Sequence, residues 1–245
     1  MNRKIQNIFL LLFLCLVSLT AKAQKNSFTA AEQQQISIAT PGLFERSNVF
    51  NIDLKILSAK EYSFPLPVGK AILKNNLSLE ITSVKGDIVL AMFDGIVRLA
   101  RKTLQYGNVV VIRHDNGLET VYAFNEQNHV KVGQQVRAGQ KIATVGGQDD
   151  HVFCLFSIMV NGGGFNPTMI VEPRSHRLQK NTIQCRKNGK FVDVSILQPE
   201  KKAITSLDPD DVKSDPFENS LTFKLDLESI GKERWAYPLP GSHVI

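Results

Sequence analysis

Short runs of alternating or β-branched apolar residues, separated by turn-forming residues, fill the chain between positions 62 and 197. Runs of this length predict β-strands, and the Gly, Asn and Asp residues between them predict tight turns. The pattern therefore predicts an all-β domain over 62–197. The segments predicted as its main strands are 88–92, 95–100, 109–113, 120–124, 141–145 and 153–160.

The segments on either side of this pattern have a different texture. Residues 24–61 are mixed in composition and are predicted to be a lead-in segment with one strand near 50–54. Inside the β domain, a late hairpin is predicted around the Lys-Asn-Gly-Lys turn at 187–190. Residues 198–234 are largely polar and contain prolines, so they are interpreted as a linker that carries one strand at 221–227.

An aromatic-Pro-Leu-Pro step occurs twice. The first copy, YSFPLP at 62–67, opens the β domain, and the second, WAYPLP at 235–240, lies close to the C-terminus. Residues 235–245 are interpreted as the start of a second, missing copy of the domain. A chance match is the alternative, because internal repeats are persuasive only when they extend over many residues.

The first 23 residues predict a secretory signal peptide. A basic start, an apolar run over 8–19 and a small-x-small step at Ala21-Lys22-Ala23 follow one another. The apolar run is shorter than the roughly 20 residues that cross a bilayer. We therefore expect an exported protein, periplasmic or extracellular, with no stable membrane span after cleavage; an uncut anchor is the alternative.

Composition limits the kinds of partner. With 43% hydrophobic and 21% charged residues, the chain can bury a proper core. Removal of residues 1–23 deletes three basic residues and no acidic one, which lowers the formal charge from +6 to +3. This charge is too small to predict a nucleic-acid partner.

Two cysteines, Cys154 and Cys185, remain after signal cleavage. They are the candidates for a disulfide, since exported proteins meet oxidising conditions. A pair of buried free thiols is the ordinary alternative for cysteines in apolar strands.

The most specific sequence features are three glycine-punctuated segments. They read GDIVLAMFDG at 86–95, YGNVVVIRHDNGLETVYAF at 106–124 and VKVGQQVRAGQKIA at 130–143. Together with NGGGFNP at 161–167, they resemble the LytM/lysostaphin-type peptidoglycan zinc endopeptidases. The resemblance covers about 64–167 and implies a LytM-like β-sandwich or barrel-sandwich hybrid core with short N- and C-terminal extensions. Lipoyl and biotin carriers share part of this texture, but no lysine stands at the expected hairpin tip.

The family's zinc ligands are replaced in this chain. In the family, zinc is held by the His and Asp of a His-x-x-x-Asp step and by the second His of a His-x-His step. The resemblance assigns these positions to Asn76, Glu80 and Leu155, with Phe153 at the first His of the pair. Of the three ligand positions only Glu80 is a credible ligand, and a catalytic zinc site needs about three. The resemblance therefore implies that zinc, the family cofactor, is absent here.

The family's further catalytic histidine falls on Phe124, which cannot transfer a proton. Shifting the match by two residues would place His151 at the first His of the pair, but Phe153 would then occupy the ligating position. Tyr122, His114 and His151 are candidates to line an apolar groove, and a structural role is the main expectation for His114.

The leading hypothesis is an exported, catalytically inactive LytM-like domain. It would bind peptidoglycan peptide or a cell-envelope protein, or support a neighbouring catalytic domain. The alternative is a part of a zinc metalloendopeptidase that cleaves peptidoglycan peptides and whose active copy lies beyond residue 245. A β module with no ligand is a third reading, favoured if Phe124, Phe153 and Leu155 are fully packed and no groove remains.

Overall fold

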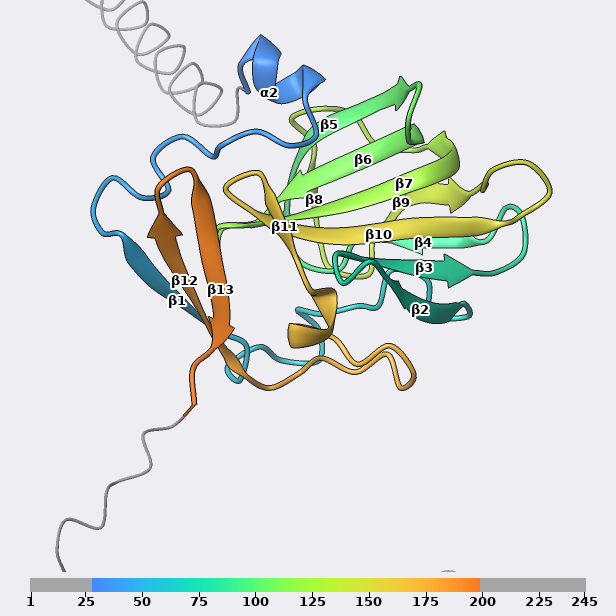
Figure 1. Cartoon of the computed structure of the whole chain (residues 1–245). Coiled ribbons are helices and arrows are strands. Elements are labelled where there is room, and N and C mark those ends of the chain that lie inside the picture. The colour runs from blue at the N-terminus through green and yellow to red at the C-terminus, as the bar shows by residue number, and fades with distance from the viewer. Residues whose placement is uncertain (1–27, 199–245) are drawn as a thin grey trace, which may run out of the picture. The chain divides into compact units, whose positions relative to one another are not determined.

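The computed structural model describes residues 28–198, which form two antiparallel sheets with short helical turns (Figure 1). The predicted signal peptide at 1–23, nearly all of the linker at 198–234 and the domain start at 235–245 lie outside the described residues. Within 28–198, no helix is long and apolar enough to cross a membrane.

The larger sheet contains ten strands. They are β2 (Lys70–Lys74), β3 (Ser78–Thr82), β4 (Ile88–Leu90), β5 (Gly95–Thr103), β6 (Gly107–Arg113), β7 (Leu118–Asn128), β8 (Gln135–Val136), β9 (Lys141–Val145), β10 (Phe153–Val160) and β11 (Gly163–Phe165). Neighbouring strands follow the order β2-β3-β10-β7-β6-β5-β8; β11 pairs with β10, and β9 pairs with both β4 and β7. A short 3-10 turn, η1 (Pro167–Met169), follows the last of these strands.

The all-β prediction is confirmed, and the strands β9 and β10 have the predicted bounds. Strand β4 ends at Leu90, two residues before its predicted end. The Met92 N–H donates a hydrogen bond of 2.8 Å to the Tyr122 hydroxyl and therefore does not pair with a neighbouring strand. The strands β5, β6 and β7 are longer than predicted, and the β2–β3 hairpin was not predicted as strands.

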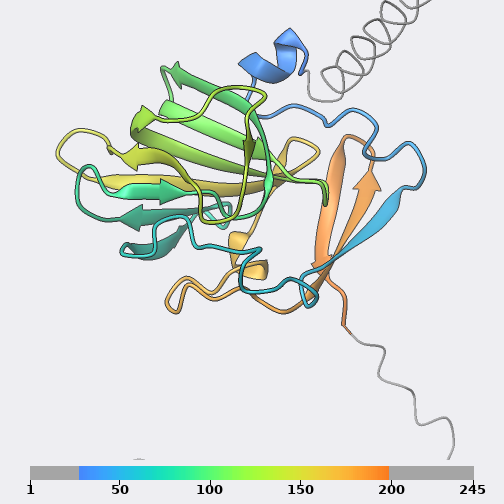
Figure 2. The same cartoon turned by 180° about the vertical axis from the view of Figure 1, so that it is seen from behind.

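The smaller sheet pairs one strand from the N-terminal part of the described residues with two strands from the C-terminal part. Its strands are β1 (Val49–Asp53), β12 (Thr182–Asn188) and β13 (Phe191–Ile196), in the order β1-β12-β13. The predicted lead-in strand and the predicted late hairpin are both present. They form one sheet beside the larger one in both views (Figures 1 and 2). The lead-in segment is thus part of the same folded unit.

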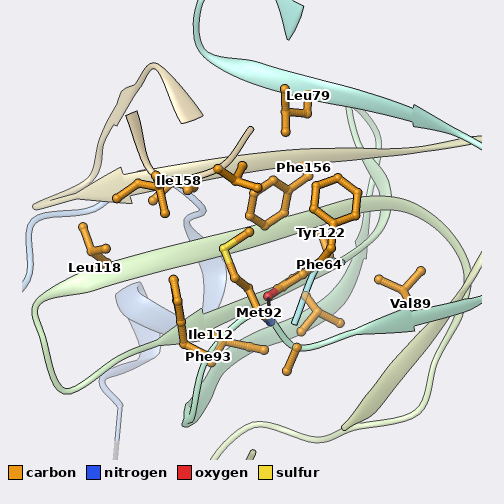
Figure 3. Close-up of a cluster of buried hydrophobic side chains, with 14 of the residues drawn as sticks. Phe64, Leu79, Val89, Met92, Phe93, Ile112, Leu118, Tyr122, Phe156 and Ile158 are labelled. Carbon is orange, nitrogen blue, oxygen red and sulfur yellow. Dashed lines mark hydrogen bonds between the residues drawn. The ribbon is translucent and has the colours of Figure 1, made fainter. Parts of the chain in front are cut away.

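The main core lies on the inner face of the larger sheet. Strand side chains alternate between faces, so every second residue of β7 and β10 points inward. Tyr122 and Phe156 meet there with ring centroids 5.4 Å apart, close to Met92 and Phe64 (Figure 3). Ile183 of the smaller sheet is buried in the same cluster, which ties the two sheets together.

The outer face of the larger sheet has a second, smaller cluster. Its buried members come from β5, β6, β7 and β10, and Ile36 packs against them from outside the sheet. Ile36 belongs to the N-terminal segment, which we define as residues 28–38. This segment contains one short helix, α2 (Ala30–Gln34), whose N-cap Thr29 forms a capping box with Glu32.

A buried ion pair fastens the N-terminal segment to the sheet. Arg98 and Glu119 both have fully buried side chains, and they are joined by hydrogen bonds of 2.6 and 3.0 Å. The remaining Arg98 donors bind the main-chain carbonyls of Glu32, Gln35 and Ile36. All five guanidinium N–H groups are therefore used, which offsets the cost of burying the charge.

We expect the substitution Arg98→Met to destabilise the protein strongly. The Glu119 carboxylate would lose its strongest partner while remaining buried, a loss that typically costs about 3–5 kcal/mol. Urea unfolding of the wild type and the variant measures the difference in free energy. Arg101→Met, an exposed position of the same strand, is the matched control and should change stability little. Equal stability of the two variants would contradict a structural role for the ion pair.

Candidate functional site

A row of four side chains crosses four neighbouring strands on the outer face. Ile72 on β2 pairs with Glu80 on β3, Glu80 with Leu155 on β10, and Leu155 with Ala123 on β7. Paired residues of neighbouring strands point to the same face, so these four side chains lie side by side. We call them the site row. It contains two of the positions that the sequence assigned to zinc ligands.

The Glu80 carboxylate is the polar member of the site row. Its Oε2 forms an ion pair with Lys74 Nζ at 3.2 Å, and its Oε1 is hydrogen-bonded to His151 Nε2, also at 3.2 Å. The Glu80 side chain is 15% exposed, whereas Lys74 and His151 are 45% and 55% exposed. The carboxylate is therefore largely covered, and its partners approach from solvent.

Four rings extend from this carboxylate across the sheet. The His151 and Phe153 ring centroids are 4.9 Å apart, those of Phe153 and Phe124 are 4.9 Å apart, and those of Phe124 and Tyr106 are 6.4 Å apart. We call these residues the aromatic row. It brings together two further predicted site positions, Phe124 and Phe153, with the groove candidate His151.

Phe124 has an unusual backbone conformation, with a φ of +60°. A left-handed conformation is strained for a bulky residue and persists only where the surroundings fix it. The Phe124 N–H donates a hydrogen bond of 2.9 Å to the Tyr106 carbonyl. The Phe124 carbonyl accepts hydrogen bonds from the N–H groups of Gly146 and Gly147, at 3.1 and 2.7 Å. These bonds fix the residue at the point where β7 changes register with β6 and β9.

An apolar groove of about 700 Å³ lies next to the two rows. Leu155 of the site row and Tyr106 of the aromatic row both line it. The other lining residues are Gln34, Ile36, Ser37, Leu77, Arg101, Thr103, Leu104, Gln105, Val121, Ala123, Ser157, Met159, Gly162 and Gly164. The groove falls in the size range of small-ligand and peptide sites.

The structure places the fifth predicted position, Asn76, in the exposed turn between β2 and β3, with a φ of +55°. Asn76 does not line the groove, although its neighbour Leu77 does. Glu80, Phe124, Phe153 and Leu155 are thus brought together, and Asn76 lies at their margin.

Two of the predicted groove candidates are core residues, so this part of the prediction is wrong. Tyr122 is fully buried on the inner face, where burial raises the pKa of its hydroxyl. His114 is buried between the Asp94 carbonyl, 2.7 Å from Nδ1, and the Thr120 hydroxyl, 2.8 Å from Nε2. These contacts confirm the expected structural role of His114.

Cys154 and Cys185, the candidates for a disulfide, are both buried free thiols, which is the ordinary alternative for cysteines in apolar strands. Cys154 lies on the inner face of β10, and Cys185 lies on β12 of the smaller sheet. Burial raises the pKa of Cys154 to about 12 and that of Cys185 to about 11. Both thiols are therefore protonated and unreactive at neutral pH.

The residues present do not fit a zinc ion. Within residues 28–198, no three His, Cys, Asp or Glu side chains lie close enough together to hold a metal. At the site, Glu80 and His151 supply two donors, whereas Leu155, Phe124 and Phe153 supply none. Zinc sites in proteins use three or four such donors.

Sequence reasoning missed Lys74, Ile72 and Tyr106 as members of the site. Lys74 and Ile72 could have been found by treating 70–74 as a strand opposite 78–82, because alternation then places them on the same face as Glu80. Tyr106 could not have been found this way, since it lies in the turn before β6.

The chain matches known proteins over this region. The model of peptidase family M23 matches residues 74–167. Murein hydrolase activator NlpD of Escherichia coli is 36% identical over 101 residues, which cover 40% of this chain and 27% of NlpD. Murein hydrolase activator EnvC of the same organism is 42% identical over 89 residues, covering 36% of this chain and 21% of EnvC. The chain thus spans about a quarter of the length of these relatives.

Among solved structures, lysostaphin from Staphylococcus simulans aligns with a TM-score of 0.43 and 21% identity. The alignment covers 46% of this chain and 53% of lysostaphin.

The burial of His114 predicts a pH-dependent stability. Burial lowers the pKa of His114 to about 4, from an ordinary value near 6.5. Between these values the unfolded chain binds a proton that the folded protein does not, so the folded state loses stability as the pH falls. This contribution amounts to about 2 kcal/mol between pH 7 and pH 5.

Urea unfolding at pH 7 and pH 5 measures this loss. The His114→Gln variant lacks the titrating group, so its stability should fall less than that of the wild type over the same interval. An identical fall in both proteins would mean that His114 is not held neutral by the fold.

Proposed function

We propose that this chain, whose residues 74–167 match the model of peptidase family M23, is an exported, non-catalytic protein that binds the peptide part of peptidoglycan in its groove. Export rests on the signal-like sequence of residues 1–23. The peptidoglycan ligand rests on the family and on the groove.

One observation carries this proposal: beside the groove, hydrocarbon side chains stand at the positions that the resemblance assigns to a zinc ligand and to a proton-transferring histidine. Leu155 stands in the middle of the site row, and Phe124 and Phe153 stack beside it. Hydrolysis of an amide needs an activated water and a group that transfers protons. Hydrocarbon side chains provide neither, whereas they do provide a surface for binding.

The groove can hold a peptide through apolar contact. Burial of apolar surface contributes roughly 25 cal/mol per Å², and the outer-face residues Val121, Leu155 and Met159 present such a surface to the groove. Ser157 and Thr103 add hydroxyl groups that can bind a peptide backbone. A binding site of this composition needs no metal.

A second candidate function is the activation of a murein hydrolase through protein contact. It is favoured by the similarity to NlpD and EnvC, which are named murein hydrolase activators. The two functions are compatible if the domain binds the cell wall while it contacts a hydrolase.

Filling the groove should abolish binding to the cell wall. Ser157 points into the groove from β10, so Ser157→Tyr would place a ring there without removing any core atom. We expect at least tenfold weaker retention of the mature protein on purified peptidoglycan sacculi, measured by co-sedimentation. Ser195→Tyr introduces the same side chain at an exposed position of β13 and should bind like the wild type. Unchanged retention of Ser157→Tyr would exclude the groove as the binding site.

Zinc should have no part in this binding. After dialysis against zinc and removal of the excess, we expect the mature protein to retain far less than one equivalent by elemental analysis. A chelator should leave retention on sacculi unchanged. Stoichiometric zinc, together with chelator-sensitive cleavage of sacculi, would overturn the non-catalytic proposal.

A further inference from the structure

The Glu80 carboxylate is a negative charge placed among hydrocarbon side chains. Its cross-strand neighbours in the site row are Ile72 and Leu155. A carboxylate that is 15% exposed loses much of its hydration, so it requires a cationic or hydrogen-bonding partner. The site thus has a defined chemical preference, and that preference is for a cation.

The cation that this carboxylate accepts is a primary ammonium. Lys74 Nζ lies 3.2 Å from Oε2, and Lys74 reaches it from the edge strand β2 with a side chain that is 45% exposed. Ion pairs of exposed side chains contribute only about 0–1 kcal/mol. A ligand ammonium can therefore replace Lys74 at little cost, because Lys74 can turn into solvent.

His151 makes the second contact to Glu80, a hydrogen bond of 3.2 Å from Nε2 to Oε1. Its side chain is 55% exposed, and its main chain is fixed by an isolated bridge to Gln148. The imidazole lies over Phe153, 4.9 Å between centroids. His151 can therefore remain at the site as a neighbour of the bound ammonium.

The aromatic row provides a path from Glu80 to the groove. Phe153 and Phe124 lie between His151 at the carboxylate and Tyr106 at the groove wall. Ring faces attract nearby cations and pack well against the methylene groups of an aliphatic chain. A ligand whose backbone lies in the groove can thus extend an aliphatic amine along the rings to Glu80.

We propose that Glu80 binds the free side-chain ammonium of a peptidoglycan peptide whose backbone occupies the groove. This inference rests on the proposed function and names its ligand class: a peptide with a diamino acid whose second amine is not cross-linked. The domain then distinguishes uncross-linked peptides from cross-linked ones, in which that nitrogen is an uncharged amide.

Chemical acetylation of sacculi tests this inference directly. Treatment with acetic anhydride converts free amines into neutral amides and leaves the glycan chains in place. We expect the mature wild-type protein to bind acetylated sacculi about tenfold more weakly than untreated ones, as for the loss of one charged hydrogen bond.

Three variants locate the effect. Glu80→Gln keeps the shape and loses the charge, so it should bind both preparations equally weakly. Glu126→Gln, an exposed carboxylate paired with Lys85 outside the groove, is the matched control and should behave like the wild type. Lys74→Met removes the competing ammonium and should strengthen binding to untreated sacculi only. Thermal melts of all variants verify that they are folded.

The outcomes separate this inference from the function on which it rests. Equal binding of the wild type to both preparations, with Glu80→Gln unchanged, would overturn the ammonium site and leave cell-wall binding intact. Absence of binding to either preparation would overturn the proposed function itself and favour contact with a hydrolase.

Discussion

The alternation of side chains along β7 and β10 is the constraint on which the rest of the structure depends. These two strands lie next to each other in the centre of the larger sheet, and they bury residues on both faces. On the inner face, Tyr122 and Phe156 join the main core. On the outer face, Val121 and Leu155 build the groove. Because the period of a strand is two, a slip of one residue would exchange core and groove completely. The packing of the inner face therefore fixes the register of β7 and β10, and with it the positions of the side chains that line the groove.

Two charged clusters lie on the outer face of the larger sheet. One is covered by the N-terminal segment, and the other, at Glu80, has exposed partners. In the covered cluster, Arg98 and Glu119 form a buried pair that also binds the main chain of the N-terminal segment. Arg113 extends this network, with bonds of 2.8 Å to Glu119 and 2.7 Å to Glu32. In the other cluster, Glu80 has partners on exposed side chains only. In the first arrangement, all five N–H groups of the buried Arg98 guanidinium have partners, which is typical of a structural contact. The second leaves a carboxylate whose partners can be exchanged, which is the property expected of a binding site and not of a structural contact.

The sequence predicts the fold class and most central strands because β9 and β10 combine β-branched runs with clear turn signals. It does not predict β2, in which only Ala71 is buried, since an edge strand with one buried residue has no visible pattern. It also cannot predict that β1 pairs with β12, because pairing between distant segments leaves no local trace. The groove assignment of Tyr122 failed for a related reason. Six consecutive residues of β7 are buried, so its two faces cannot be told apart by hydrophobicity. The positions Glu80, Phe124, Phe153 and Leu155 came from the family resemblance and not from burial, and the structure places them close together.

The replacements at the site leave Glu80 as the one carboxylate of the site row, among apolar neighbours. Leu155, Phe124 and Phe153 are larger or more apolar than metal ligands, and together they make the middle of the outer face hydrophobic. In such surroundings a carboxylate is disfavoured by desolvation, and an apolar or amide side chain at position 80 would fit the row at lower cost. The pairs that Glu80 forms with Lys74 and His151 offset little of this cost, because both partners are half exposed. The ammonium ligand proposed above would give this carboxylate a charged partner in surroundings that are otherwise apolar. An ammonium group on an aliphatic chain meets both requirements of the site, the charge at Glu80 and the ring faces beside it.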